Sequence, residues 1–133
     1  MPHQIIEYSA NLDDRLDVQD LVDTMHHTAA TCGVFPLAGI RTRAVRRAYY
    51  HIADGHPDNT FVNVYMRIAP RPEELRKKAG DILFDALCAY LKPLQDKMPL
   101  AISFEIQQLN PDRRRKNNLR EYMKERGSYV QEQ

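Results

Sequence analysis

Twice along the chain, an extended segment, a helical segment and a second extended segment follow one another, and this duplication limits the fold more than any other feature. In the first half, residues 3–9 are rich in isoleucine and tyrosine and predict a strand. Residues 18–32 carry apolar side chains at helical spacing, with Asp17 as a predicted N-cap and Gly33 as the glycine that ends the helix. Residues 40–45 predict the second strand of this unit.

The second unit has a clearer periodicity. Residues 61–68 alternate apolar and polar side chains, which is typical of a strand with one buried face. Pro72 suits the first helical position, and Glu73 and Glu74 fall in the first turn, where the helix dipole favours anions. One long apolar stripe then follows at helical spacing: Leu75, Ala79, Ile82, Leu83, Ala86, Leu87, Tyr90, Leu91 and Leu94. Residues 100–106 alternate again and predict the last strand.

The two units predict an α+β fold, a duplicated β-α-β with one four-stranded sheet. Because crossovers between parallel strands are right-handed, both helices are expected on the same face of the sheet. We predict a single domain over residues 2–109, followed by a charged extension over residues 110–133. The domain would consist of pseudo-repeats 2–46 and 61–107. The other face of the sheet keeps part-apolar side chains such as Tyr65, which favours burial against another copy of the chain.

Charge and hydropathy argue against several classes of function. The net charge is only +1, without the broad positive field of a nucleic-acid-binding protein. No apolar run approaches the roughly 20 residues that span a bilayer, and no basic segment followed by an apolar stretch indicates a signal peptide. We therefore expect a cytoplasmic protein that binds neither nucleic acid nor membrane.

The cysteines and histidines do not predict a metal site. Cys32 and Cys88 fall at apolar helix positions, and we interpret both as reduced core residues. The five histidines form no H-x-x-x-H or H-x-H ligand pattern. His56 lies in "ADGHPDN", a stretch with turn chemistry, where a simple connection is favoured over an acid–base role.

The extension is basic, with seven Lys/Arg against four Asp/Glu from Asn110 onward. Its basic run, residues 113–116, lacks the interleaved aromatic side chains on which bases stack. We interpret this run as a solvated tail or a subunit contact rather than a nucleic-acid patch.

Pro2 carries a chemically distinctive group once Met1 is removed, namely a free secondary amine at the start of a strand. An amine is a useful general base only if part of it is neutral at working pH, and its usual pKa of about 7.7–8.0 or above must therefore fall. Partial burial and nearby cations both lower it. Arg41 and Arg43, which project on one face of the second strand, could supply that field and bind substrate carboxylates. Arg71, just before the second helix, could supply a further clamp.

Six stretches of the chain together resemble one branch of the tautomerase superfamily. In chain order they are "MPHQIIEYSANL", "TCGVFPLAGIRTRA", "ADGHPDNTFVNV", "ALCAYL", "LAISFEIQQL" and "KNN". They are similar to the 5-carboxymethyl-2-hydroxymuconate delta-isomerases, which share the superfamily with 4-oxalocrotonate tautomerase and macrophage migration inhibitory factor. The resemblance runs from Pro2 to about Asn118, nearly the whole chain.

The resemblance implies a trimer of duplicated β-α-β subunits and proton transfer without metal or cofactor on a small di- or tricarboxylate. The implied substrate is 5-carboxymethyl-2-hydroxymuconate, in homoprotocatechuate (4-hydroxyphenylacetate) degradation. The catalytic proline maps onto Pro2, provided that Met1 is removed, and the carboxylate-binding arginine maps onto Arg41. A further substrate-binding arginine ahead of the second helix, a clamp for the dienolate, maps onto Arg71. Residues after Asn118 extend past the usual end of the family, either as a helix that wraps a neighbouring subunit or as a frayed tail.

Two alternatives stay open at the level of the sequence. The chain could be a tautomerase of the same fold that acts on another unsaturated oxo acid. It could also be a non-catalytic oligomeric binding module that uses its basic extension. Retention of Met1 would favour the second alternative, because Pro2 would then be an internal amide without a basic nitrogen.

Overall fold

The computed structural model describes residues 2–128. Both predicted strand-helix-strand units are present. In chain order the elements are β1 (His3–Ser9), the 3-10 turn η1 (Ala10–Leu12), α1 (Val18–Thr31), the 3-10 turn η2 (Leu37–Gly39), β2 (Arg41–Arg47), β3 (Thr60–Ile68), α2 (Glu73–Gln95), β4 (Leu100–Gln108) and α3 (Leu119–Glu125). Strand β2 starts one residue later than predicted because Ile40 ends the η2 turn, and β4 continues to Gln108 because its pairing with β3 continues to Ile68.

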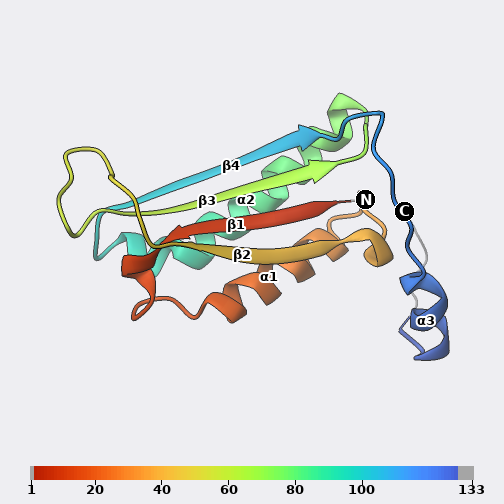
Figure 1. Ribbon diagram of the computed structural model, residues 1–133, viewed down its shortest axis with the longest axis horizontal. Helices are drawn as coiled ribbons and strands as arrows, with labels where there is room; N and C mark the ends of the chain where they lie inside the picture. Colours follow the sequence, from red (N-terminus) through yellow and green to blue (C-terminus); the bar gives the residue numbers. More distant parts are fainter. Residues whose placement is uncertain (1, 129–133) are drawn as a thin grey trace.

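The four strands form one sheet in the order β2-β1-β3-β4. Strands β1 and β2 are parallel, as are β3 and β4, whereas the central pair β1 and β3 is antiparallel. Figure 1 shows α1 and α2 behind the sheet, on the same face of it. The predicted α+β fold, with two helices on one face of a four-stranded sheet, is confirmed.

The core lies between this helical layer and the sheet. Its centre on α2 is a row of fully buried side chains spaced four residues apart, Ala79, Leu83, Leu87 and Leu91. The prediction was wrong for Ile82, whose residue surface is 37% exposed. Successive helical residues point about 100° apart, so when Leu83 faces the sheet its neighbour Ile82 points toward solvent.

Local signals at the helix ends also acted as expected, with one shift. The side chain of Asp17 accepts a 3.0 Å hydrogen bond from the N–H of Asp20, and Gly33 takes the left-handed backbone conformation (φ 85°) directly after Cys32, the C-cap of α1. Pro72, predicted as the first helical residue, is instead the N-cap of α2. Its ψ of 149° is extended, while its carbonyl oxygen accepts the first bonds from Leu75 and Arg76.

The two cysteines differ in their surroundings. Both are free thiols, and Cys32 is buried in the core as predicted. Cys88 was wrongly predicted as a core residue, because it lies on the flank of α2 and is only half-buried. Partial burial still raises the pKa of its thiol, with a smaller contribution from Asp85.

Truncation of Leu87 to alanine should destabilise the fold strongly. Its side chain is fully buried between α2 and the sheet, so Leu87→Ala leaves a cavity and should lower the free energy of unfolding by about 2–5 kcal/mol. Ile82→Ala, on the same helix but 37% exposed, is the matched control and should cost under half as much. Urea denaturation of both variants at one protein concentration measures the difference, and equal losses would mean that Leu87 is no better packed than Ile82.

The extension after β4 crosses the end of the sheet. We call residues 109–118 the strap. At one end of the strap, the N–H of Leu109 donates to the carbonyl oxygen of Ile68 (2.6 Å). At the other end, the side-chain amide of Asn117 donates to the carbonyl oxygen of Ala38 in η2 (3.0 Å), and α3 follows beside η2. Figure 1 shows the strap passing the ends of β3, β1 and β2.

The face of the sheet away from α1 and α2 has no helix over it in the described part of the chain (Figure 1). It carries a mixture of apolar and polar side chains, among them Ile5, Val45, Tyr65, Ala101 and Glu105. Burial of this face against another copy therefore stays a prediction. None of the described helices has the length and apolar character required to span a bilayer.

Candidate active site

Pro2 is buried at the start of β1, between two other strands. Its carbonyl oxygen accepts a 3.0 Å hydrogen bond from the N–H of Arg41. The next residue, His3, pairs with Arg41 on β2 and with Arg67 on β3. Pro2 therefore lies at the end of the sheet where β1 and β2 begin and β3 ends.

Four of the side chains around this point form a cluster on the uncovered face of the sheet: His3, Arg41, Arg43 and Arg67, which we call the sheet-face cluster. Nη1 of Arg43 lies 3.3 Å from Nδ1 of His3. Burial lowers the pKa of His3, and the positive charges of Arg43, Arg41 and Arg67 lower it further. The imidazole is therefore neutral at neutral pH and accepts the hydrogen bond that the guanidinium donates.

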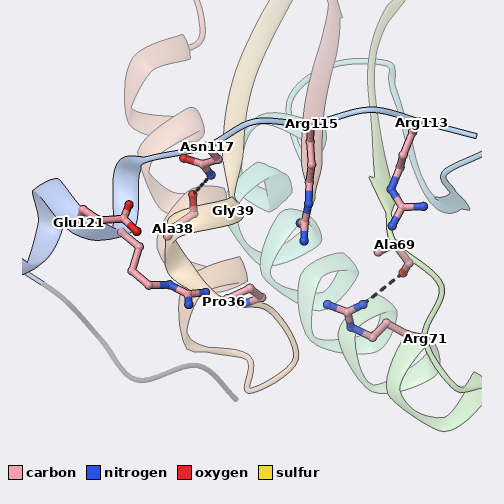
Figure 2. Close-up of a pocket in the computed structure, with 10 residues that line it drawn as sticks. Pro36, Ala38, Gly39, Ala69, Arg71, Arg113, Arg115, Asn117 and Glu121 are labelled. Carbon is pink, nitrogen blue, oxygen red and sulfur yellow. Dashed lines mark hydrogen bonds between the residues drawn. The ribbon is translucent and has the colours of Figure 1, made fainter. Parts of the chain in front are cut away.

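A cavity of about 430 Å³ opens at the same end of the sheet, and we call it the arginine cavity. One wall is η2 with the residue before it, and another consists of Ala69 and Arg71, which follow β3. The strap and α3 form the rest (Figure 2). The residues that line it are Pro36, Ala38, Gly39, Ala69, Arg71, Arg113, Arg115, Asn117, Arg120 and Glu121. This volume is within the range of sites that hold small organic ligands.

The arginine cavity is strongly positive. Four guanidinium groups line it against the single carboxylate of Glu121, and arginine does not lose its proton in proteins. Nη1 of Arg71 donates to the carbonyl oxygens of Pro70 (3.2 Å) and Ala69 (3.5 Å), which hold its guanidinium at the cavity wall. The N-terminus of α2, two residues beyond Arg71, adds a partial positive charge. The cavity is therefore suited to an anion.

The structure brings the sequence-predicted arginines to one end of the sheet but divides them into two sets. Arg41 and Arg43 belong to the sheet-face cluster, as the alternation along β2 indicated, and neither lines the arginine cavity. Arg71 lines that cavity with three arginines that sequence reasoning had not placed in the site, Arg113, Arg115 and Arg120.

The interpretation of residues 113–116 as a solvated tail or a subunit contact was incomplete. Arg113 and Arg115 face the arginine cavity of their own chain (Figure 2). The contact that attaches this end of the strap, between Asn117 and Ala38, joins residues 79 positions apart. The only available signal was the run of arginines itself, which does not indicate its target.

His56 belongs to a turn at the other end of the sheet, as favoured from the sequence. Its Nδ1 accepts a 3.1 Å hydrogen bond from the N–H of Asp58. The neighbouring residue Asn59 is bonded through its carbonyl oxygen to Asn11, which follows the far end of β1 from Pro2. Within residues 2–128, no group of three His, Cys, Asp or Glu side chains is arranged to hold a metal ion.

Comparison with known proteins agrees with the resemblance found in the sequence. The sequence model of the 5-carboxymethyl-2-hydroxymuconate isomerase family matches residues 2–123. The chain belongs to the 5-carboxymethyl-2-hydroxymuconate isomerase family. The match includes Pro2, the whole strap and part of α3, so the family extends beyond Asn118 in this chain.

Individual relatives of the family support the same assignment. The 5-carboxymethyl-2-hydroxymuconate Delta-isomerase of Escherichia coli is 38% identical over 119 residues, which are 89% of this chain and 94% of the relative. A crystal structure of a 5-carboxymethyl-2-hydroxymuconate isomerase from Deinococcus radiodurans R1 superposes with a TM-score of 0.80 at 32% identity, over 89% of this chain and 90% of that one.

A more distant structure shares the fold of this family. It is described as a Q0 fused 4-OT wild type symmetric trimer, with a TM-score of 0.56 at 17% identity, over 80% of this chain and 85% of that one. This similarity confirms the tautomerase fold expected from the sequence.

Proposed function

We propose that this isomerase interconverts 5-carboxymethyl-2-hydroxymuconate and its oxo isomer, 5-oxopent-3-ene-1,2,5-tricarboxylate, with the amine of Pro2 moving the proton. The observation that carries the proposal is the family match from Pro2 to residue 123. The reaction takes a proton from the enol oxygen, shifts the double bonds and delivers a proton to carbon, so no atom is gained or lost. It is one step in homoprotocatechuate (4-hydroxyphenylacetate) catabolism, which would take place in the cytoplasm.

The surroundings of Pro2 support its role as the base. Pro2 is buried, and its chain neighbour His3 already has a lowered pKa because of burial and three arginines. The same burial and the same positive charges would disfavour the ammonium form of the Pro2 amine once Met1 is removed. A neutral fraction of the amine at neutral pH would then accept the proton from the enol oxygen and deliver it to carbon.

The arginines would bind and polarise the substrate. Arg71 points into a cavity of the right size and can stabilise the negative charge that develops on the dienolate. Arg41 and Arg43 lie on the uncovered sheet face beside Pro2 and would bind a carboxylate there. We further propose a homotrimer, in which another copy of the chain covers this mixed, part-apolar face and completes the site; the related 4-OT trimer supports this assembly.

The proposed function is tested by the intact mass of the protein from its native host, measured together with turnover. We expect a mass without Met1 and an ultraviolet absorbance change when 5-carboxymethyl-2-hydroxymuconate is added. A panel of other unsaturated oxo acids distinguishes the proposed activity from that of a related tautomerase, because only the correct substrate should give the highest kcat/KM. Retained Met1 with no turnover on any of these acids would leave the non-catalytic binding module as the better explanation.

Arg41→Ala should raise KM for the tricarboxylate by about tenfold while kcat changes less, because one charge-assisted bond to a substrate carboxylate is lost. Arg47→Ala is the matched control. Arg47 lies on the same face of β2 but six residues away, at the other end of the strand, where it is paired with Glu7 at 2.7 Å. Steady-state kinetics of both variants measure the effect. An Arg41→Ala variant with unchanged KM and kcat would contradict the role of Arg41 in binding a substrate carboxylate.

A further inference from the structure

The strap holds its arginines in a fixed place relative to the sheet. Its two ends are attached by the bonds from Leu109 to Ile68 and from Asn117 to Ala38. Between them, a turn is closed by the N–H of Arg113, which donates to the carbonyl oxygen of Asn110 (3.1 Å). The backbone of residues 113–115 is therefore anchored on both sides, across the end of the sheet where Pro2 lies.

Two strap side chains point from this backbone into the arginine cavity. Figure 2 shows Arg113 and Arg115 directed toward the wall that carries Arg71. A second, smaller cavity of about 200 Å³ is lined by His3, Arg67, Leu109 and the three strap arginines. Arg113 and Arg115 thus border both the arginine cavity and a cavity that contains two members of the sheet-face cluster.

The charges of these side chains are not balanced within the described chain. No ion pair joins Arg71, Arg113 or Arg115 to an acidic side chain among residues 2–128. Arg113 donates one long hydrogen bond, 3.4 Å, to the carbonyl oxygen of Asn110, and Arg115 has no hydrogen-bond partner in the same part of the chain. Most of the ten N–H donors that two guanidinium groups offer are therefore available to a ligand.

We propose that the strap is a substrate-binding element, in which Arg113 and Arg115 bind a carboxylate of the substrate at the end opposite the dienolate that Arg71 stabilises. This inference rests on the proposed function and adds to it the residues that select substrates with several carboxylates. A guanidinium fork matches a carboxylate with two parallel hydrogen bonds, so two such groups opposite Arg71 favour a ligand that is anionic at both ends. An acid with one carboxylate would leave the strap arginines unpaired.

The test compares two substrates with the same dienol, 5-carboxymethyl-2-hydroxymuconate with three carboxylates and 2-hydroxypenta-2,4-dienoate with one. In the double variant R113Q/R115Q, the ratio of kcat/KM for the tricarboxylate to that for the monocarboxylate should fall by tenfold or more, mostly through KM. The control R126Q removes one positive charge from the end of α3, outside the cavity, and should keep the wild-type ratio. Circular dichroism verifies that the variants are folded.

A ratio that stays at the wild-type value in R113Q/R115Q, or that falls equally in R126Q, would overturn the inference while the proposed function stands. If no turnover is found, a binding measurement tests the inference about the strap separately from the proposed function. By calorimetry, propane-1,2,3-tricarboxylate should bind wild-type protein and lose tenfold or more in affinity in R113Q/R115Q. A loss of affinity in R113Q/R115Q without any turnover would support carboxylate binding by the strap and count against the proposed reaction. Equal affinities of the wild type and R113Q/R115Q would overturn carboxylate binding by the strap.

Discussion

Pro2→Ala is expected to lower kcat by about 10²-fold or more, in the range that a positioned general base contributes. The variant keeps a small second residue, so Met1 can still be removed. It replaces a ring-fixed secondary amine by a less basic primary amine on a rotating bond, which no longer holds the proton acceptor in one orientation. Steady-state turnover of 5-carboxymethyl-2-hydroxymuconate measures the loss.

The fold should tolerate Pro2→Ala. The carbonyl oxygen of residue 2 still accepts the hydrogen bond from Arg41, and proline contributes no N–H to the sheet that alanine would have to replace. His56→Ala is the matched control, since His56 lies in a turn at the far end of the sheet, and its turnover should equal that of the wild type. A Pro2→Ala variant of unchanged kcat, with Met1 removed according to its mass, would rule out Pro2 as the base.

Arg71→Gln is expected to lower kcat/KM by about 10²–10³-fold, with most of the effect in kcat. Its guanidinium is fixed by the carbonyl oxygens of Ala69 and Pro70 and lines the arginine cavity, so it offers preorganised charge where dienolate charge would develop. Glutamine keeps hydrogen-bonding capacity but loses the positive charge.

The separate effects of Arg71→Gln on kcat and on KM show which role Arg71 has. A rise in KM alone would mean that Arg71 only binds the ground-state carboxylate, and a change of less than twofold in kcat/KM would remove it from the site. Lys78→Gln removes a positive charge from an exposed position on α2, outside the cavity lining, and should leave both constants within twofold of the wild type.

Most of the fold could be predicted because the signals that specify it are local. The alternation in β3 and β4, the stripe on α2 and the cap at Asp17 each depend on residues within a few positions of one another. The errors at Ile82 and Cys88 have one cause: both are apolar residues at the edge of a helical stripe. Whether such a residue is buried depends on how far the sheet extends beneath the helix, and spacing alone does not contain that information.

The candidate site was less predictable from the residues. Alternation along β2 placed Arg41 and Arg43 on one face, and the residues themselves suggested the amine of Pro2 and the position of Arg71 before the second helix. The family resemblance then gave roles to Pro2, Arg41 and Arg71. Nothing local could show that the arginines divide into a set on the sheet face and a set around a cavity. That division depends on the strap, whose position is set by single contacts between residues distant in the sequence, such as Asn117 with Ala38.

The strap also determines when a growing polypeptide can acquire its complete site. Pro2 leaves the ribosome ahead of all four strands, whereas Arg113 to Asn117 emerge only after all four strands have been made. A nascent chain that ends at Gln108 already contains every strand and both long helices, but one wall of the cavity has not yet been synthesised. The complete cavity therefore cannot bind a ligand until every strand of the sheet has been synthesised.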